Sequence, residues 1–137
     1  MKIVRQSDAG AAAGQAPPPR ISIVDDDASI REALTSLMRS VRFGVDVFAS
    51  AEEFLASERV NDAACLILDV YLPGMSGFDL QRQLAAVASH LPIIFISAHA
   101  DDDPQAQALA AGAVAFLYKP FYEEELLNAI NAALKNS

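Results

Sequence analysis

From residue 20 onward, short apolar runs alternate along the chain with stretches in which apolar residues recur at helical spacing. The short runs are rich in Ile, Val, Leu and Phe and lack strict polar alternation, which is typical of parallel strands buried on both faces. The pattern therefore predicts five strands, at Ile21–Val24, Val45–Phe48, Ala64–Leu68, Ile93–Ile96 and Ala113–Tyr118.

The first two predicted helices follow the first two strands. Gly44, just after Phe43, is expected to end the first helix. Ser50 suits the N-cap of a short second helix, with Glu53 as its capping-box partner and with Phe54 and Leu55 inside it. The apolar face of the first helix is predicted to contain Ile30, Ala33, Leu34, Leu37, Met38 and Val41.

Three further helices follow the remaining strands. One begins after Ser76 and Gly77, and another has Asp103 as N-cap and Pro104 at its first position and stops at Gly112. The latter offers Leu109 as its one large apolar anchor among Ala and Gln. The last helix begins near Glu123. The apolar positions are Leu80, Leu84, Val87 and Ala88 in the helix after Gly77, and Leu126, Leu127, Ile130 and Leu134 in the last.

Five successive strand–helix units predict an α/β fold, a doubly wound parallel sheet with helices on both faces. A chain of 137 residues suits one domain. Residues 1–19 contain five Ala, two Gly and three Pro without apolar periodicity, so we expect a flexible tail there and a single domain over residues 20–137.

Composition and charge narrow the function classes. The net charge of −8 disfavours direct binding of nucleic acid by this chain, because phosphate backbones would repel it. No apolar run approaches the roughly 18 residues of a membrane span, and no signal peptide is evident. Cys65, the single cysteine, lies in a predicted strand and is expected to be a buried thiol. A cytoplasmic location is expected.

Polar residues stand where four of the five strands end. Asp25 and Asp26 follow the first strand, Asp69 the third, Ser97 the fourth and Lys119 the fifth. The carboxyl ends of parallel strands meet at one edge of the sheet, so these side chains should converge. Each of them alone would suit a helix cap or a solvated strand end, but four strand ends together indicate a site.

Three carboxylates at one place repel one another unless a cation or a raised pKa relieves them. Mg²⁺ is the expected cation, because it prefers oxygen ligands and the chain has no His or Cys cluster suited to zinc. With Mg²⁺ and Lys119 beside it, Asp69 could accept a phosphoryl group as an aspartyl phosphate.

At these residues the chain resembles the receiver domains of two-component response regulators, from Arg20 to about Leu134. The resemblance rests on four motifs in the family's order and spacing, and it implies the flavodoxin-like strand order 2-1-3-4-5. The motifs are Val24-Asp25-Asp26, Leu68-Asp69-Val70-Tyr71-Leu72-Pro73-Gly74-Met75-Ser76-Gly77, Ile96-Ser97-Ala98 and Tyr118-Lys119-Pro120-Phe121.

The resemblance implies a role for each site residue. Asp69 would be the phosphoacceptor, and Asp25, Asp26, Asp69 and the Tyr71 carbonyl would hold Mg²⁺. Lys119, joined to Pro120 by a cis peptide bond, would contact the phosphoryl oxygen. Ser97 would move to the phosphate, and the Phe116 ring would follow it as the switch. Tyr71 and His99 would flank the path of the hydrolytic water and tune dephosphorylation.

The resemblance also implies partners. A sensor histidine kinase or a histidine phosphotransfer protein would donate the phosphoryl group. The remodelled face would be formed by residues 103–111, the fifth strand and the last helix, and it would control an output partner or domain or pair with a second copy of the chain. The run Ser50-Ala51-Glu52-Glu53-Phe54-Leu55 resembles the subgroup with helix-turn-helix output domains.

Three other classes fit the sequence less well. An aspartyl-phosphate phosphohydrolase of similar fold is the chief alternative, but it needs an acid two residues after the nucleophile, where this chain has Tyr71. A pseudo-receiver would lack part of the acidic set or Lys119. A nucleotide-binding flavodoxin-like protein would want a Gly-rich loop where Asp25-Asp26-Asp27 stands.

Overall fold

A five-stranded parallel sheet forms the centre of the structure, a computed structural model that describes residues 17–87, 90–98 and 104–135. The order is β3-β2-β4-β5-β6, which is the predicted order 2-1-3-4-5. Its strands are β2 (Arg20–Val24), β3 (Gly44–Phe48), β4 (Cys65–Asp69), β5 (Ile93–Ser97) and β6 (Ala115–Tyr118). The doubly wound fold is confirmed.

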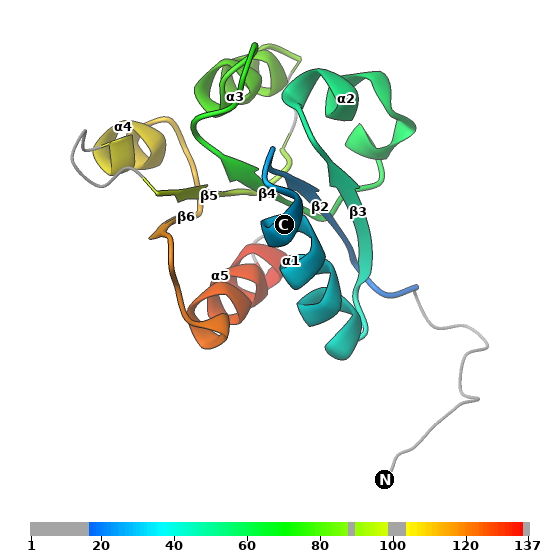
Figure 1. Ribbon diagram of the computed structural model, residues 1–137. Coiled ribbons are helices and arrows are strands. Elements are labelled where there is room, and N and C mark those ends of the chain that lie inside the picture. The colour runs from blue at the N-terminus through cyan, green and yellow to red at the C-terminus, as the bar shows by residue number, and fades with distance from the viewer. Residues whose placement is uncertain (1–16, 88–89, 99–103, 136–137) are drawn as a thin grey trace, which may run out of the picture.

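Helices cover both faces of the sheet (Figure 1). On one face lie α2 (Ala51–Ala56), α3 (Gly77–Ala86) and α4 (Pro104–Ala110), and on the other lie α1 (Ala28–Ser40) and α5 (Glu123–Lys135). A short 3₁₀ helix, η2 (Glu58–Val60), which the sequence analysis did not predict, follows α2. Within the part of the chain that the structure describes, no helix is long and apolar enough to cross a bilayer.

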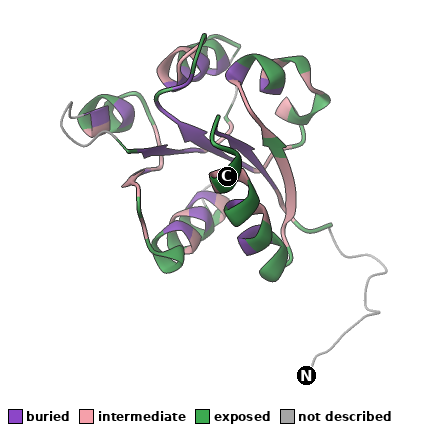
Figure 2. Cartoon of the chain, in the orientation of Figure 1, coloured by how far each residue is buried: buried purple, intermediate pink, exposed green. Residues whose placement is uncertain are grey.

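Two apolar clusters, one on each face of the sheet, form the core. Every residue of β4 and β5 is buried, whereas the edge strands β3 and β6 are only partly covered (Figure 2). Cys65 opens β4 with a fully buried thiol, as predicted, and its burial raises the pKa of that thiol to about 12. The polar residues at the ends of the central strands therefore lie next to a buried, apolar core.

Side chains cap the starts of three helices. The Asp27 carboxylate accepts from the Ser29 backbone N–H at the start of α1. Ser50 is the N-cap of α2, as predicted, and its hydroxyl accepts from the Glu53 N–H at 3.1 Å, but the Glu53 carboxylate accepts from the Ala49 N–H at 3.2 Å and not from Ser50, so the predicted capping box is only half formed. Ser76 caps α3 within a capping box. The predicted Asp103 cap, Ala88 and residues 1–16 of the expected tail lie outside the described residues.

Other details of the helix predictions are wrong. Gly44 does not end α1; the helix stops at Ser40, Arg42 takes the left-handed conformation with φ of 67°, and Gly44 opens β3. Val41 and Val87 follow the last turns of their helices and are 37% and 72% exposed, because each is a C-cap that has turned away from the helix's buried face.

The prediction that Leu109 anchors α4 to the sheet is also wrong. Leu109 is 41% exposed, and α4 faces the sheet with Pro104 and Ala108 instead. Pro104 and Ala108 are four residues apart and share one face of α4, whereas Leu109 lies about 100° further round the helix. Strand β6 begins at Ala115 rather than Ala113, and β4 begins at Cys65 rather than Ala64.

Candidate functional site

Three carboxylates meet at the carboxyl ends of β2 and β4, which are neighbours in the sheet. Asp25 is fully buried, Asp69 is 6% exposed and Asp26 is open to solvent. Each offers an oxygen within 4.8 Å of the others. Backbone N–H groups orient the two buried carboxylates: Asp27 donates to Asp25 Oδ1 at 2.9 Å and Tyr71 to Asp69 Oδ1 at 3.1 Å.

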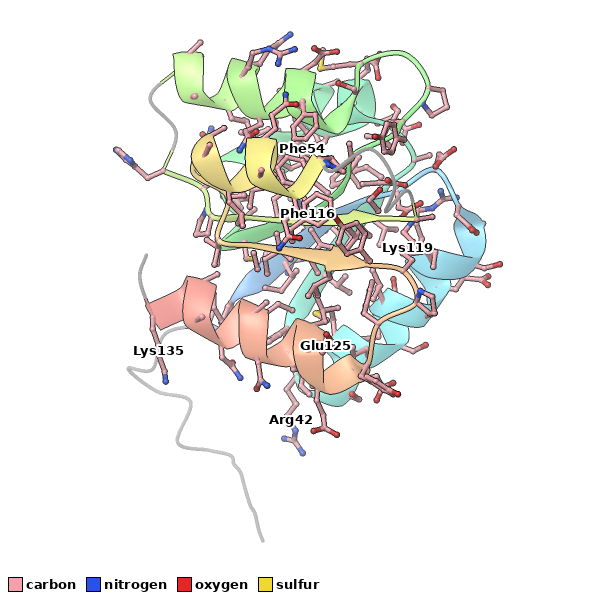
Figure 3. All side chains as sticks on the ribbon, turned by 90° about the vertical axis from the view of Figure 1, so that its left-hand side faces the viewer. Arg42, Phe54, Phe116, Lys119, Glu125 and Lys135 are labelled. Atoms are coloured by element: carbon pink, nitrogen blue, oxygen red, sulfur yellow. The ribbon has the colours of Figure 1, made fainter. Side chains whose placement is uncertain are left out.

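Lys119 joins the two buried carboxylates. Its Nζ lies 2.8 Å from Asp25 Oδ2 and 3.2 Å from Asp69 Oδ2. The residue directly follows β6, at the carboxyl edge of the sheet (Figure 3), and its backbone N–H donates to the Ser97 carbonyl at 2.8 Å. The Lys119–Pro120 peptide bond is cis, as predicted.

The electrostatics of the site follow from burial and from these ion pairs. Burial and the neighbouring charge of Asp25 raise the pKa of Asp69 above its ordinary value, although the Lys119 ammonium opposes the rise. Burial acts to lower the pKa of Lys119, but its ion pairs with Asp25 and Asp69 outweigh that effect and raise it. Asp69 is therefore a carboxylate whose negative charge is only partly compensated.

The donor set fits a hard divalent cation. The three carboxylates and one ammonium carry a formal charge of −2, and the carboxylate oxygens lie close enough to share one ion. Mg²⁺ binds through one or two carboxylates and keeps several waters, so an edge with Asp26 open to solvent suits it. In these residues the structure thus brings together an acidic cluster that could bind a metal.

The other predicted site residues lie around this cluster. Ser97 is fully buried at the end of β5, and the Tyr71 side chain is 39% exposed beyond β4. Phe116 is 7% exposed, and Figure 3 shows it between the sheet and α4. Its ring centroid lies 6.2 Å from that of Phe95 and 5.0 Å from that of Tyr118. His99 lies outside the described residues.

The sequence analysis missed three residues that shape this edge. Arg31 donates to the Asp25 carbonyl at 2.8 Å, and Glu52 accepts from the Met75 N–H at 2.9 Å. A Cβ on Gly77 would stand 2.4 Å from the Asp69 carbonyl oxygen, so only glycine permits α3 to begin so close to the acidic edge. Gly77 had a signal in its motif, whereas the two charged residues resemble ordinary surface side chains.

The chain is similar to known regulators over most of its length. Response regulator protein TodT of Pseudomonas putida is 53% identical over 115 residues, which cover 84% of this chain and 51% of TodT. Transcriptional regulatory protein FixJ of Bradyrhizobium diazoefficiens is 35% identical over 117 residues, covering 85% of this chain and 57% of FixJ. The chain spans about half the length of these relatives.

Solved structures agree in fold. The response regulator StyR superposes with a TM-score of 0.81 at 47% identity, over 86% of this chain and 60% of that chain. The structure of FixJ-N gives a TM-score of 0.78 at 34% identity, over 87% of this chain and 95% of that chain.

The family comparison covers most of the chain. Residues 21–131 match the response regulator receiver domain. This range contains every predicted site residue. Receiver domains are signalling domains whose general function is that of a phosphoryl-accepting switch, and they imply a histidine kinase as partner. The sequence, the fold and the relatives together show that the chain belongs to the response regulator receiver domain family.

Proposed function

We propose that Asp69 is the phosphoacceptor of this switch. The observation that carries the proposal is the Lys119 ammonium held between Asp25 and Asp69 at the buried carboxyl edge. An Asp69 oxygen would attack the phosphorus of a phosphohistidine on a sensor kinase or phosphotransfer protein. The new O–P bond forms as the P–N bond breaks, and the electron pair leaves with the imidazole nitrogen.

The surrounding residues would stabilise the transferred charge. Lys119 would donate from Nζ to a phosphoryl oxygen and Ser97 from its hydroxyl, while Asp25 orients the ammonium. Asp25, Asp26, Asp69 and the Tyr71 carbonyl would hold Mg²⁺. When bound, this ion would neutralise negative charge on the equatorial oxygens of the phosphoryl group. The acidic edge would otherwise repel the incoming group.

Phosphorylation would be read on the face formed by α4, β6 and α5. Ser97 and Phe116 lie on the neighbouring strands β5 and β6, so movement of the Ser97 side chain towards the phosphate would reach the Phe116 ring. The remodelled face would contact an output domain, another partner or a second copy of the chain. The acidic chain itself would leave contact with nucleic acid to that output partner.

Mass spectrometry tests the phosphoacceptor directly. The protein is incubated with acetyl phosphate and Mg²⁺, and we expect one added phosphoryl group that EDTA prevents. Asp69→Asn should abolish the addition, while the exposed Asp62→Asn serves as a charge-matched control. Addition of the same extent in Asp69→Asn would refute the assignment.

Tyr71 should set how long the phosphoryl group persists. Its half-exposed ring stands two residues beyond Asp69, beside the proposed path of the hydrolytic water. Tyr71→Asn replaces this shield with a small polar side chain that helps to hold water, so the phosphoprotein should lose its label about tenfold faster, which corresponds to about 1.4 kcal/mol of barrier. Decay is followed at constant Mg²⁺, with Tyr122→Asn as the control; an unchanged or longer lifetime for Tyr71→Asn would contradict shielding.

A further inference from the structure

The loop between β4 and α3, residues 70–76, is fixed at its base by backbone hydrogen bonds. The Val70 N–H donates to the Ile96 carbonyl at 3.1 Å, and the Gly77 N–H donates to the Val70 carbonyl at 2.9 Å. Both bonds close the loop next to the sheet. They do not reach its tip, where the chain turns at Gly74 with φ of 75°.

A side chain from another helix holds the tip. Glu52 Oε2 in the first turn of α2 accepts from the Met75 N–H at 2.9 Å, across a separation of 23 residues. The same oxygen would lie 2.6 Å from a Cβ on Gly74, so the carboxylate rests directly against the turn. The bond from the Met75 N–H also lowers the pKa of Glu52, because it favours the ionised carboxylate.

Helix α2 is a firm support for this contact. Ala51 and Phe54 are fully buried on either side of Glu52, and Ser50 caps the helix. The strand before α2 also reaches the acidic edge, because the Phe48 carbonyl accepts from the Asp25 N–H at 3.1 Å. The segment from β3 to α2 thus contacts the site at two places, at Asp25 through the backbone and at the loop through Glu52.

We propose that Glu52 is a positioning residue, which holds loop 70–76 so that the Tyr71 carbonyl stays in place for the cation. The inference rests on the proposed Mg²⁺ site and adds a residue that would touch neither the ion nor the phosphoryl group. A free loop tip would let the carbonyl sample other orientations, and binding would then have to restrict that freedom. Loss of the Glu52 contact would weaken the site without removing a ligand.

The test compares three variants of the full chain. Glu52→Ala removes the acceptor, Glu52→Gln keeps an acceptor oxygen without the charge, and Glu124→Ala removes an exposed glutamate elsewhere. Thermal unfolding first confirms that each variant folds. Amide hydrogen exchange of residues 70–76 is then measured in EDTA, and the Mg²⁺ dissociation constant is measured by calorimetry with the metal alone.

We expect Glu52→Ala to speed exchange at the Met75 amide and to raise the Mg²⁺ dissociation constant, each by about fivefold, the effect of one net hydrogen bond. Glu52→Gln should stay within about twofold of the wild type on this scale, and Glu124→Ala should match the wild type. Three results would overturn the inference. The Met75 amide could exchange at the wild-type rate in Glu52→Ala, or it could exchange faster while the Mg²⁺ affinity stays unchanged. Glu52→Gln could also lose as much Mg²⁺ affinity as Glu52→Ala. A wild-type protein that binds no Mg²⁺ would instead overturn the proposed function, and the exchange data would still report the contact.

Discussion

Burial and the neighbouring charge of Asp25 both disfavour a negative charge on Asp69. Lys119 offsets only part of this, since its ammonium is shared between the two carboxylates at 2.8 and 3.2 Å. The pKa of Asp69 is therefore raised in the folded protein. A charge that is poorly compensated in the resting protein is a suitable place for a cation and a reactive oxygen, and it costs folding stability.

Asp69→Asn should stabilise the metal-free protein at neutral pH. The unfolded carboxyl ionises near 3.8 and the folded one at higher pH, so the wild type loses stability as pH rises through this interval. The amide carries no charge and escapes that loss. We expect a gain on the order of 1 kcal/mol at pH 7, measured by thermal unfolding in EDTA.

The pH dependence separates this cause from a change in packing. Below pH 3.8 the wild-type carboxyl is protonated in both states, so the advantage of Asp69→Asn should disappear. The exposed Asp62→Asn should show no such gain at pH 7. A gain that persists unchanged into acid would point to packing instead of charge.

Among the elements, α1 ends in an unusual way for a non-glycine residue. The Phe43 N–H donates to the Met38 carbonyl and the Arg42 N–H to the Arg39 carbonyl, the pair of bonds that defines a Schellman ending. Arg42 occupies its left-handed position, where a Cβ is unfavourable. The helix end satisfies its carbonyls but retains local backbone strain.

Arg42→Gly should raise the free energy of unfolding by about 1 kcal/mol, because glycine takes the left-handed conformation without a steric penalty. Urea unfolding measures the change. Arg39→Gly is the matched control, since the same substitution inside the last turn of α1 should lower stability by about 1 kcal/mol. Equal effects of the two substitutions would argue against this account of the helix end.

Helix α4 should be the less firmly held of two helices on opposite faces. It buries Pro104 and Ala108, whereas α1 buries Leu34, Leu37 and Met38. The smaller apolar area gives α4 less stabilisation against local opening. Its amides should exchange at least about tenfold faster than those in the middle of α1, a difference of about 1.4 kcal/mol in opening free energy; equal protection in both helices would contradict this.

The sequence predicted elements well where local chemistry decides them. Strands such as β4 and β5 are apolar on both faces, and Ser50 caps α2 through a bond to a residue three positions away. Helix ends such as Arg42 were not predictable, because a non-glycine residue in the left-handed region leaves no local signal. The exposure of Leu109 likewise depends on which face of α4 packs on the sheet, and tertiary contacts decide that.

Across the whole molecule, the topology explains why the site was predictable in part. Parallel strands bring their carboxyl ends to one edge, so Asp25, Asp26, Asp69 and Lys119 were expected together and are together. The Glu52–Met75 contact joins two surface segments through tertiary packing. No residue spacing encodes that approach, and it became visible only in the structure.

The buried thiol of Cys65 provides a built-in reporter of unfolding. Cys65 is the only cysteine of a chain without tryptophan, and burial both shields it and suppresses its thiolate. A thiol reagent at pH 8 should leave the native protein unmodified and label it completely in urea. Rapid labelling without denaturant would contradict a sealed core.

The labelling rate of the Cys65 thiol therefore measures how readily the core opens. Because the reagent reaches β4 only when the sheet opens, slow labelling of the native protein reports that opening. The measurement needs no introduced probe, so the labelling rate of the same chain can be compared with Mg²⁺, with a phosphoryl donor and with neither. Any ligand that stabilises the carboxyl edge should slow the labelling of the thiol at the other end of β4.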